Sequence, residues 1–127
     1  MHILLADGRP KVRFALRALL TRQTAPHVLH EASDAQDLLA QAEVSCPDLV
    51  LLDWELPGLA PSDLIPALRR ACPKAAVVAL SGKVSARREA LAAGVDAFVS
   101  KGDPPERLLS TIDGCAQTGS GHQNSES

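Results

Sequence analysis

The stretch that decides the fold is Pro47-Asp48-Leu49-Val50-Leu51-Leu52-Asp53-Trp54-Glu55-Leu56-Pro57-Gly58. A run of branched apolar residues ends here in a carboxylate, and a Pro-Gly turn follows. A short apolar run of this kind is typical of a parallel strand that is buried on both faces. Ligands of open α/β sheets bind at the carboxyl ends of the strands. Asp53 is therefore the first candidate for a functional residue.

The composition predicts a single domain with an aliphatic core. The chain has 127 residues, of which 46% are hydrophobic and only 2% aromatic, and its formal net charge is -2. A chain of this length can bury a core without metal or disulfide staples. The weak charge and the scarcity of aromatic side chains argue against direct nucleic-acid binding and against an anionic membrane surface. The start of the chain lacks the basic segment of a signal peptide, and no apolar run reaches membrane-spanning length, so a cytoplasmic protein is expected.

The cysteines give no sign of a covalent or metal framework. Cys46, Cys72 and Cys115 are odd in number, widely spaced and without a CxxC pair. This pattern predicts neither a disulfide framework nor a zinc site. We expect reduced thiols at the ends of secondary-structure elements.

Apolar runs and helical patterns alternate five times along the chain. Besides the central stretch, strands are expected over residues 3–6, 27–32, 75–80 and 97–99. Helices are expected between and after them, with starts at Pro10, in the capping box from Ser33 to Gln36, after Gly58, at Ser85 and after Asp103. Alternation at these lengths predicts an α/β fold, a doubly wound parallel sheet with helices on both faces.

Three further expectations concern the helices and the end of the chain. The basic residues of the first helix are expected to face water. Pro66 is expected to make the third helix start late or irregularly, because proline removes a backbone donor. The domain is expected to span residues 1–117, followed by a disordered polar tail over residues 118–127.

Four polar side chains stand at the carboxyl ends of expected strands, namely Asp7, Asp53, Ser81 and Lys101. The strands of a parallel sheet end at the same edge, so these residues should converge there. Two carboxylates, a hydroxyl and an ammonium suit a divalent cation held by oxygens beside a phosphoryl group. A carboxylate can also be the nucleophile and form an acyl phosphate.

Residues 1–117 resemble the receiver domain of two-component response regulators, particularly those that precede a helix-turn-helix output domain. The resemblance rests on motifs whose order and spacing are specific together, although each is weak alone. They are Ile3-Leu4-Leu5-Ala6-Asp7 with Pro10, the central stretch from Pro47 to Gly58, Val77-Val78-Ala79-Leu80-Ser81-Gly82, Ala92-Ala93-Gly94-Val95-Asp96-Ala97-Phe98, and Ser100-Lys101. The resemblance implies a flavodoxin-like sheet of five strands in the order 2-1-3-4-5 with five helices.

The resemblance also implies roles for individual residues. Asp53 would accept a phosphoryl group from a phosphohistidine, with Ser81 following that group and Lys101 pairing with it. Mg²⁺ would be held by Asp7, by Asp53 and by the backbone carbonyl of Glu55. The aromatic side chain that reports the switch is matched by Phe98.

The partners implied by the resemblance are a histidine kinase or phosphotransfer protein as donor and a downstream effector protein as target. The resemblance also allows a phosphorylation-dependent homodimer. The output would pass through the surface formed by the fourth helix, the fifth strand and the fifth helix. The chain would not be an enzyme acting on a separate substrate, but a signalling domain limited to its own phosphorylation and dephosphorylation.

One departure from the family pattern bears on the metal. The family normally has a second acid directly after the position of Asp7, and this chain has Gly8 there, followed by Arg9. The loss of that acid should weaken Mg²⁺ binding and slow phosphotransfer. The side chain of Glu55 either compensates for Gly8 over the pocket or acts only through its carbonyl. A cation at Arg9 either replaces part of the metal charge or is simply solvated.

Two rival functions stay open at this point. Gly8 motivates a degenerate receiver that binds partner proteins without phosphorylation. The pair of Asp53 and Glu55 after a buried strand also suggests a phosphatase with an aspartate nucleophile. The phosphatase is disfavoured, because the sequence has neither a second Asp at the right spacing nor an inserted cap domain.

Overall fold

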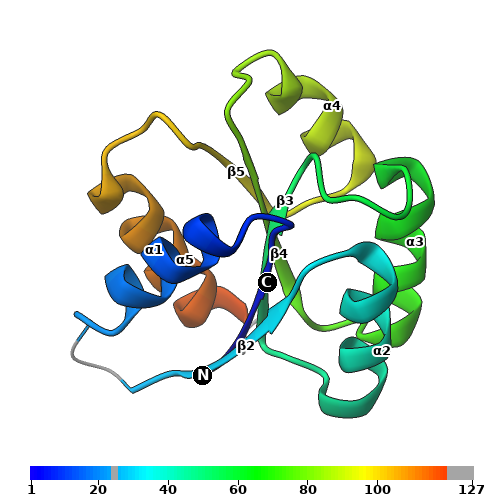
Figure 1. Cartoon of the computed structure of the whole chain (residues 1–127), viewed down its shortest axis with the longest axis horizontal. Helices are drawn as coiled ribbons and strands as arrows, with labels where there is room; N and C mark the ends of the chain where they lie inside the picture. The colour runs from blue at the N-terminus through cyan, green and yellow to red at the C-terminus, as the bar shows by residue number, and fades with distance from the viewer. Residues whose placement is uncertain (24–25, 120–127) are drawn as a thin grey trace.

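The computed structural model describes residues 1–23 and 26–119, and the side chains of residues 116–119 are not described. Within these residues, five strands alternate with five helices (Figure 1). The strands are β1 (His2–Ala6), β2 (Val28–Ala32), β3 (Leu49–Asp53), β4 (Ala76–Ser81) and β5 (Ala97–Ser100). The helices are α1 (Pro10–Leu20), α2 (Ala35–Ser45), α3 (Pro61–Ala71), α4 (Ala86–Ala93) and α5 (Pro105–Gly119).

The strands form one parallel sheet in the order β2-β1-β3-β4-β5. Helices α1 and α5 cover one face of this sheet, and α2, α3 and α4 cover the other (Figure 1). The expected doubly wound, flavodoxin-like fold with strand order 2-1-3-4-5 is therefore confirmed. No helix in the described part of the chain is both long enough and apolar enough to cross a bilayer.

Strand β3 lies at the centre of the sheet, and all five of its residues are buried. Val50 and Leu52 pack into the core under α2, α3 and α4, whereas Leu49 and Leu51 pack into the core under α1 and α5. Burial of each such side chain contributes about 1.5–3 kcal/mol. Strand β3 thus contributes side chains to the hydrophobic core on both faces of the sheet. This burial fixes the position of Asp53 at its end.

The capping residue of α2 differs from the expected capping box. Asp34 is the N-cap, and its side chain accepts a hydrogen bond from the backbone N–H of Asp37 at 2.8 Å. Gln36 instead donates its side-chain amide to the carbonyl of Gly58 at 3.3 Å. The capping box expected from Ser33 to Gln36 is therefore wrong. Asp34 caps the helix in place of Ser33, and the side chain of Gln36 bonds to the loop after β3.

The expectation for α3 is also wrong. The helix begins at Pro61, which occupies the first turn, and it continues through Pro66 in its interior. An interior proline costs about 3 kcal/mol in an isolated helix. Here Pro66 is exposed, whereas Leu64, Ile65 and Leu68 are buried against the sheet. Tertiary burial of that apolar face offsets the missing backbone hydrogen bond.

The last helix extends slightly past residue 117, where the domain was expected to end. Helix α5 runs to Gly119, so residues 118 and 119 of the expected tail belong to the helix. The rest of the expected tail, residues 120–127, lies outside the described residues.

Two cysteines form a disulfide bond that the sequence did not predict. Cys46 and Cys72 directly follow α2 and α3, and their Cα atoms are 5.5 Å apart. The expectation of reduced thiols is therefore wrong for this pair, while Cys115 is free. The two cysteines meet because α2 and α3 pack on the same face and end at the same edge, which their separation of 26 residues does not reveal.

Helix α1 is joined to β2 through Glu31. Its carboxylate accepts hydrogen bonds from Nε of Arg13 and Nε of Arg17, each at 2.9 Å. These two guanidinium groups, Arg17 first, lower the pKa of Glu31 below its ordinary value. The ion pairs thus favour the ionised form of Glu31 in the folded chain.

We expect reduction of the disulfide to destabilise the chain by about 3 kcal/mol, because it frees a loop of 26 residues in the unfolded state. Urea unfolding with and without dithiothreitol measures the change. The Cys115→Ser variant should show the same sensitivity to the reductant. Equal midpoints, or thiol titration that finds Cys46 and Cys72 both reactive without reductant, would contradict the bond.

We expect Glu31→Gln to lower the stability at neutral pH by about 0.5–1 kcal/mol, since the paired carboxylate is partly exposed. The pKa of Glu31 is lowered by folding, so its contribution is present above the unfolded pKa and is lost as the pH falls through the folded pKa. The two chains should therefore converge in acid. Urea unfolding at neutral and acidic pH tests this, with the exposed Glu43→Gln as control; a difference that persists in acid would refute the ion-pair origin.

Candidate functional site

The four predicted strand-end residues converge at one edge of the sheet. Asp7 follows β1, Asp53 ends β3, Ser81 ends β4 and Lys101 follows β5. The ammonium of Lys101 donates to Oδ2 of Asp7 at 2.9 Å and to Oδ1 of Asp53 at 3.3 Å. Asp7 and Asp53 are only 1% and 5% exposed, so the lysine joins two buried carboxylates.

Asp53 is oriented by the turn that follows its strand. The backbone N–H of Glu55 donates to Oδ1 of Asp53 at 3.1 Å, and the N–H of Leu56 donates to the carbonyl of Asp53 at 3.0 Å. Between them, the N–H of Trp54 continues the ladder to β4 by donating to the carbonyl of Leu80 at 2.8 Å. The carboxylate is therefore held at the end of a buried strand by backbone geometry as well as by Lys101.

Asp7 is surrounded by cationic side chains. Its Oδ1 accepts the backbone N–H of Arg9 at 2.9 Å and lies 3.6 Å from Nε of the same residue. The side chain of Arg9 is 63% exposed, so this ion pair is largely solvated. The guanidinium of Arg13 donates to the backbone carbonyl of Asp7 at 2.6 Å.

Arg13 is a site residue that the sequence reasoning missed, because the basic residues of α1 were expected to face water. Its side chain is only 16% exposed and bridges Glu31 and the loop after β1. A signal was available: Glu31 lies on the strand next to β1, within reach of a helix that begins just after Asp7. Arg13 thus braces the loop that carries one of the two site carboxylates.

Ser81 lies beside Asp53, because Asp53 is the register partner of the preceding residue, Leu80. The Ser81 hydroxyl donates to Oε2 of Glu55 at 3.0 Å and accepts the backbone N–H of Lys83 at 3.0 Å. The Glu55 side chain is therefore turned toward β4 and holds Ser81.

The donor set fits a magnesium ion with two side-chain ligands. Mg²⁺ in proteins is often bound by one or two carboxylates together with phosphate and water, and Asp7, Asp53 and the carbonyl of Glu55 offer oxygen donors of this type. Among the residues that the structure describes, no three His, Cys, Asp or Glu side chains gather as a metal site. Gly8 adds no ligand, and a Cβ atom there would lie 3.2 Å from Cδ of Pro57.

Two aromatic side chains connect this edge to α4. Trp54, next to Asp53, is 6% exposed and donates its indole N–H to Oε1 of Glu89 at 3.0 Å. Phe98, the predicted switch residue, is 8% exposed, and the guanidinium carbon of Arg87 lies 6.0 Å from its ring centroid. The sequence singled out Phe98 but not Glu89, since nothing in the pattern aligns α4 with the loop after β3.

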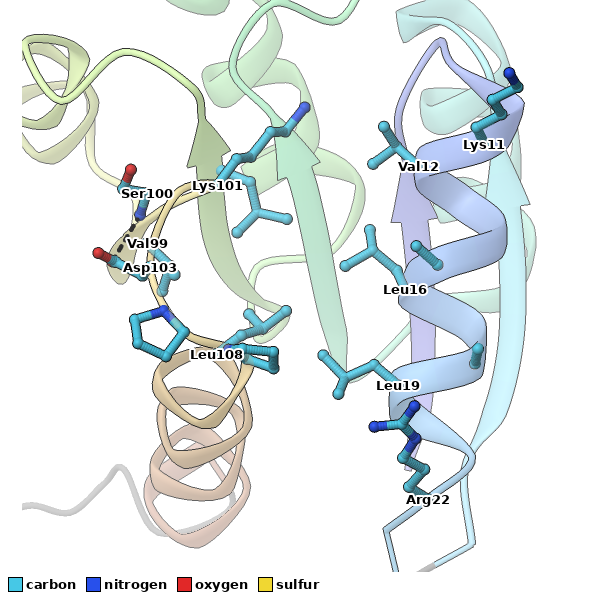
Figure 2. A pocket seen from close by; sticks show the side chains of 15 residues that line it. Lys11, Val12, Leu16, Leu19, Arg22, Val99, Ser100, Lys101, Asp103 and Leu108 are labelled. Atoms are coloured by element: carbon cyan, nitrogen blue, oxygen red, sulfur yellow. Dashed lines mark hydrogen bonds between the residues drawn. The ribbon is translucent and has the colours of Figure 1, made fainter.

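A groove of about 600 Å³ runs between α1 and α5. Figure 2 shows Val12, Leu16 and Leu19 facing Leu108 across it, with Lys101 at its upper end. The groove is mainly apolar and begins beside the cluster of Asp7, Asp53 and Lys101. The site therefore opens next to an apolar surface between two helices.

The comparisons with known proteins agree with this geometry. The family model of the response regulator receiver domain matches residues 3–113. The chain is 31% identical over 88% of its length to the transcriptional activator protein ExaE of Pseudomonas putida, and 32% identical over 87% to the nitrate/nitrite response regulator protein NarL of Escherichia coli strain K12. It covers 53% of ExaE and 52% of NarL, so it spans about half the length of these curated relatives.

Solved structures share the fold. A two-component response regulator of the LuxR family from Aurantimonas sp. SI85-9A1 superposes with a TM-score of 0.82 at 27% identity, covering 91% of this chain and 85% of that one. The chemotaxis response regulator CheY4 of Vibrio cholerae has a TM-score of 0.78 at 22% identity, with 90% and 97% of the two chains covered, and shows the fold alone. The family match over most of the chain, together with these relatives, means that the chain belongs to the response regulator receiver domain family.

Proposed function

We propose that Asp53 is the phosphoacceptor of this receiver domain in two-component signal transduction, and that its donor is a phosphohistidine on a histidine kinase or phosphotransfer protein. The observation that carries the proposal is the bridge from Lys101 to the buried carboxylates of Asp7 and Asp53. An acid that served only to form a turn would not need to pair with a lysine at the end of another strand. The chemistry of this cluster suits a group that gains negative charge when modified.

The proposed step is a phosphoryl transfer to a carboxylate. An oxygen of Asp53 attacks the phosphorus, a new O–P bond forms, and the P–N bond to the donor imidazole breaks with its electron pair going to the nitrogen. Lys101 is placed to pair with the added negative charge, and Ser81 to donate its hydroxyl once it leaves Glu55. The product is an acyl phosphate on Asp53.

Asp7, Asp53 and the backbone carbonyl of Glu55 would hold Mg²⁺, which supplies positive charge that favours a phosphoryl group at this edge. Because Gly8 provides no carboxylate, we propose that the affinity for the ion is weaker than in receivers with a second acid. Because the group that is phosphorylated belongs to the chain itself, the chain would catalyse only its own phosphorylation from a donor and its own dephosphorylation.

The partners and the location are proposed on the same basis. The chain spans about half the length of ExaE, a transcriptional activator, and of NarL, a response regulator, so a downstream effector, in the same or another polypeptide, is the target we propose. Output would pass through α4, β5 and α5, where Phe98 lies, with a phosphorylation-dependent homodimer as one form. We further propose that the chain works in the cytoplasm without itself contacting nucleic acid.

The rival functions are weaker on the geometry. The degenerate receiver was motivated by Gly8 alone, whereas Asp7, Asp53, Ser81 and Lys101 are all in place at one edge. The phosphatase drew on Asp53 and Glu55, but the carboxylate of Glu55 accepts the Ser81 hydroxyl. A phosphoacceptor uses the whole cluster, so it is preferred.

We expect incubation with a small phosphodonor such as acetyl phosphate, with millimolar Mg²⁺, to add one phosphoryl group to the full chain. Asp53→Asn should abolish this, because an amide is not a nucleophile of this kind. Intact-mass spectrometry measures the modification, with the exposed Asp63→Asn as a matched control that stays reactive. Labelling that survives in Asp53→Asn refutes the assignment, and a wild-type chain that is inert to donors and to a cognate kinase supports the degenerate receiver.

We expect Gly8→Asp to tighten Mg²⁺ binding by about tenfold, since it adds a carboxylate ligand at the edge that holds Asp7 and Asp53. The added Cβ needs a shift of a few tenths of an ångström by the exposed ring of Pro57. Titration of Mg²⁺ against the fluorescence of Trp54, the single tryptophan, measures the affinity. Gly8→Ala separates the crowding from the charge, and equal affinities for Gly8→Asp and Gly8→Ala would show that position 8 does not reach the metal.

A further inference from the structure

Among the described helices, α4 buries the smallest side chains in the core. Its buried residues are Ala86 and Ala90, whereas α3 buries Leu64, Ile65 and Leu68. It has eight residues, and the side chain of its N-cap, Ser85, makes no capping hydrogen bond. Because apolar burial scales with area, contacts outside the core matter more for the position of α4 than for that of α3.

Those contacts come from the first turn of α4 and reach two nearly buried aromatic rings. Glu89 accepts the indole N–H of Trp54 at 3.0 Å, and the guanidinium of Arg87 lies over Phe98. Glu89 is itself exposed, so the bond joins a solvent-facing helix residue to a ring that is 6% exposed. An indole N–H that lost this acceptor would be left without a partner in a largely buried position, which is unfavourable.

Trp54 is linked through its backbone to Asp53 and to β4. It is the residue between Asp53 and Glu55, and its backbone N–H is bonded to the carbonyl of Leu80 on β4. Glu55 in turn donates its N–H to Asp53 and accepts the hydroxyl of Ser81. A change that draws Ser81 away from Glu55 therefore acts on the peptide units that carry the Trp54 ring.

We propose that Glu89 is a positioning residue for the loop after Asp53: through the indole of Trp54 it holds that loop in its unmodified arrangement and ties the position of α4 to the state of Asp53. The proposal rests on the proposed function, since it names the contact by which modification of Asp53 is felt by α4. A contact can transmit a change only if it differs between the two states. The bond from Trp54 to Glu89 is that contact here.

The first test needs no phosphorylation. Glu89→Ala should increase the acrylamide quenching of Trp54 and speed backbone amide exchange in α4 on the order of fivefold or more. Glu89→Gln keeps an acceptor oxygen and should behave as wild type. Glu106→Ala is the matched control, because Glu106 is likewise an exposed acid in the first turn of its helix, but on α5. Unchanged quenching and exchange in Glu89→Ala would overturn the proposal.

The second test concerns the coupling. In the wild-type chain, acyl phosphate at Asp53, or beryllofluoride bound there with Mg²⁺, should change amide exchange in α4; in Glu89→Ala, α4 should exchange rapidly with or without modification. If both chains respond equally, Glu89 is merely structural and the coupling is refuted. If the wild-type chain is not modified at Asp53 at all, the proposed function fails and the coupling falls with it, while the quenching experiment still decides whether Glu89 holds the loop.

Discussion

The ammonium of Lys101, shared between the carboxylates of Asp7 and Asp53, is the interaction on which the site depends. Two carboxylates that are almost fully buried repel each other and are poorly solvated, so they need a cation between them. Lys101 and Asp7 are 94 residues apart in the chain. They meet only when β5 has been added at the far side of β4 and the sheet is complete, so the site exists only in the folded domain.

The sheet order is what makes this pairing geometrically simple. Strand β3 lies between β1 and β4, and its two apolar faces are covered by separate sets of helices. Its burial on both faces leaves the carboxyl end as the place where a polar side chain can be presented. Asp53 is therefore fixed by the hydrophobic core below it and neutralised by the charge beside it, and Arg13 secures the adjoining loop after β1.

The consecutive residues Asp53, Trp54 and Glu55 each contact a different element of the fold. Asp53 contacts Lys101, Glu55 contacts Ser81, and Trp54 contacts Glu89 on α4. These contacts connect the carboxyl end of β3 to a surface helix within one tight turn.

The sequence by itself determined the α/β class, the five strands, and Asp7, Asp53, Ser81 and Lys101 as site candidates, because apolar runs mark buried parallel strands and parallel strands end at one edge. The tertiary structure alone decided the disulfide between Cys46 and Cys72, the continuous helix through Pro66, and the contacts of Arg13 and Glu89. Each of these depends on how a helix is rotated and where it ends relative to a neighbour. Those quantities are set by packing of the whole core, and no local spacing encodes them.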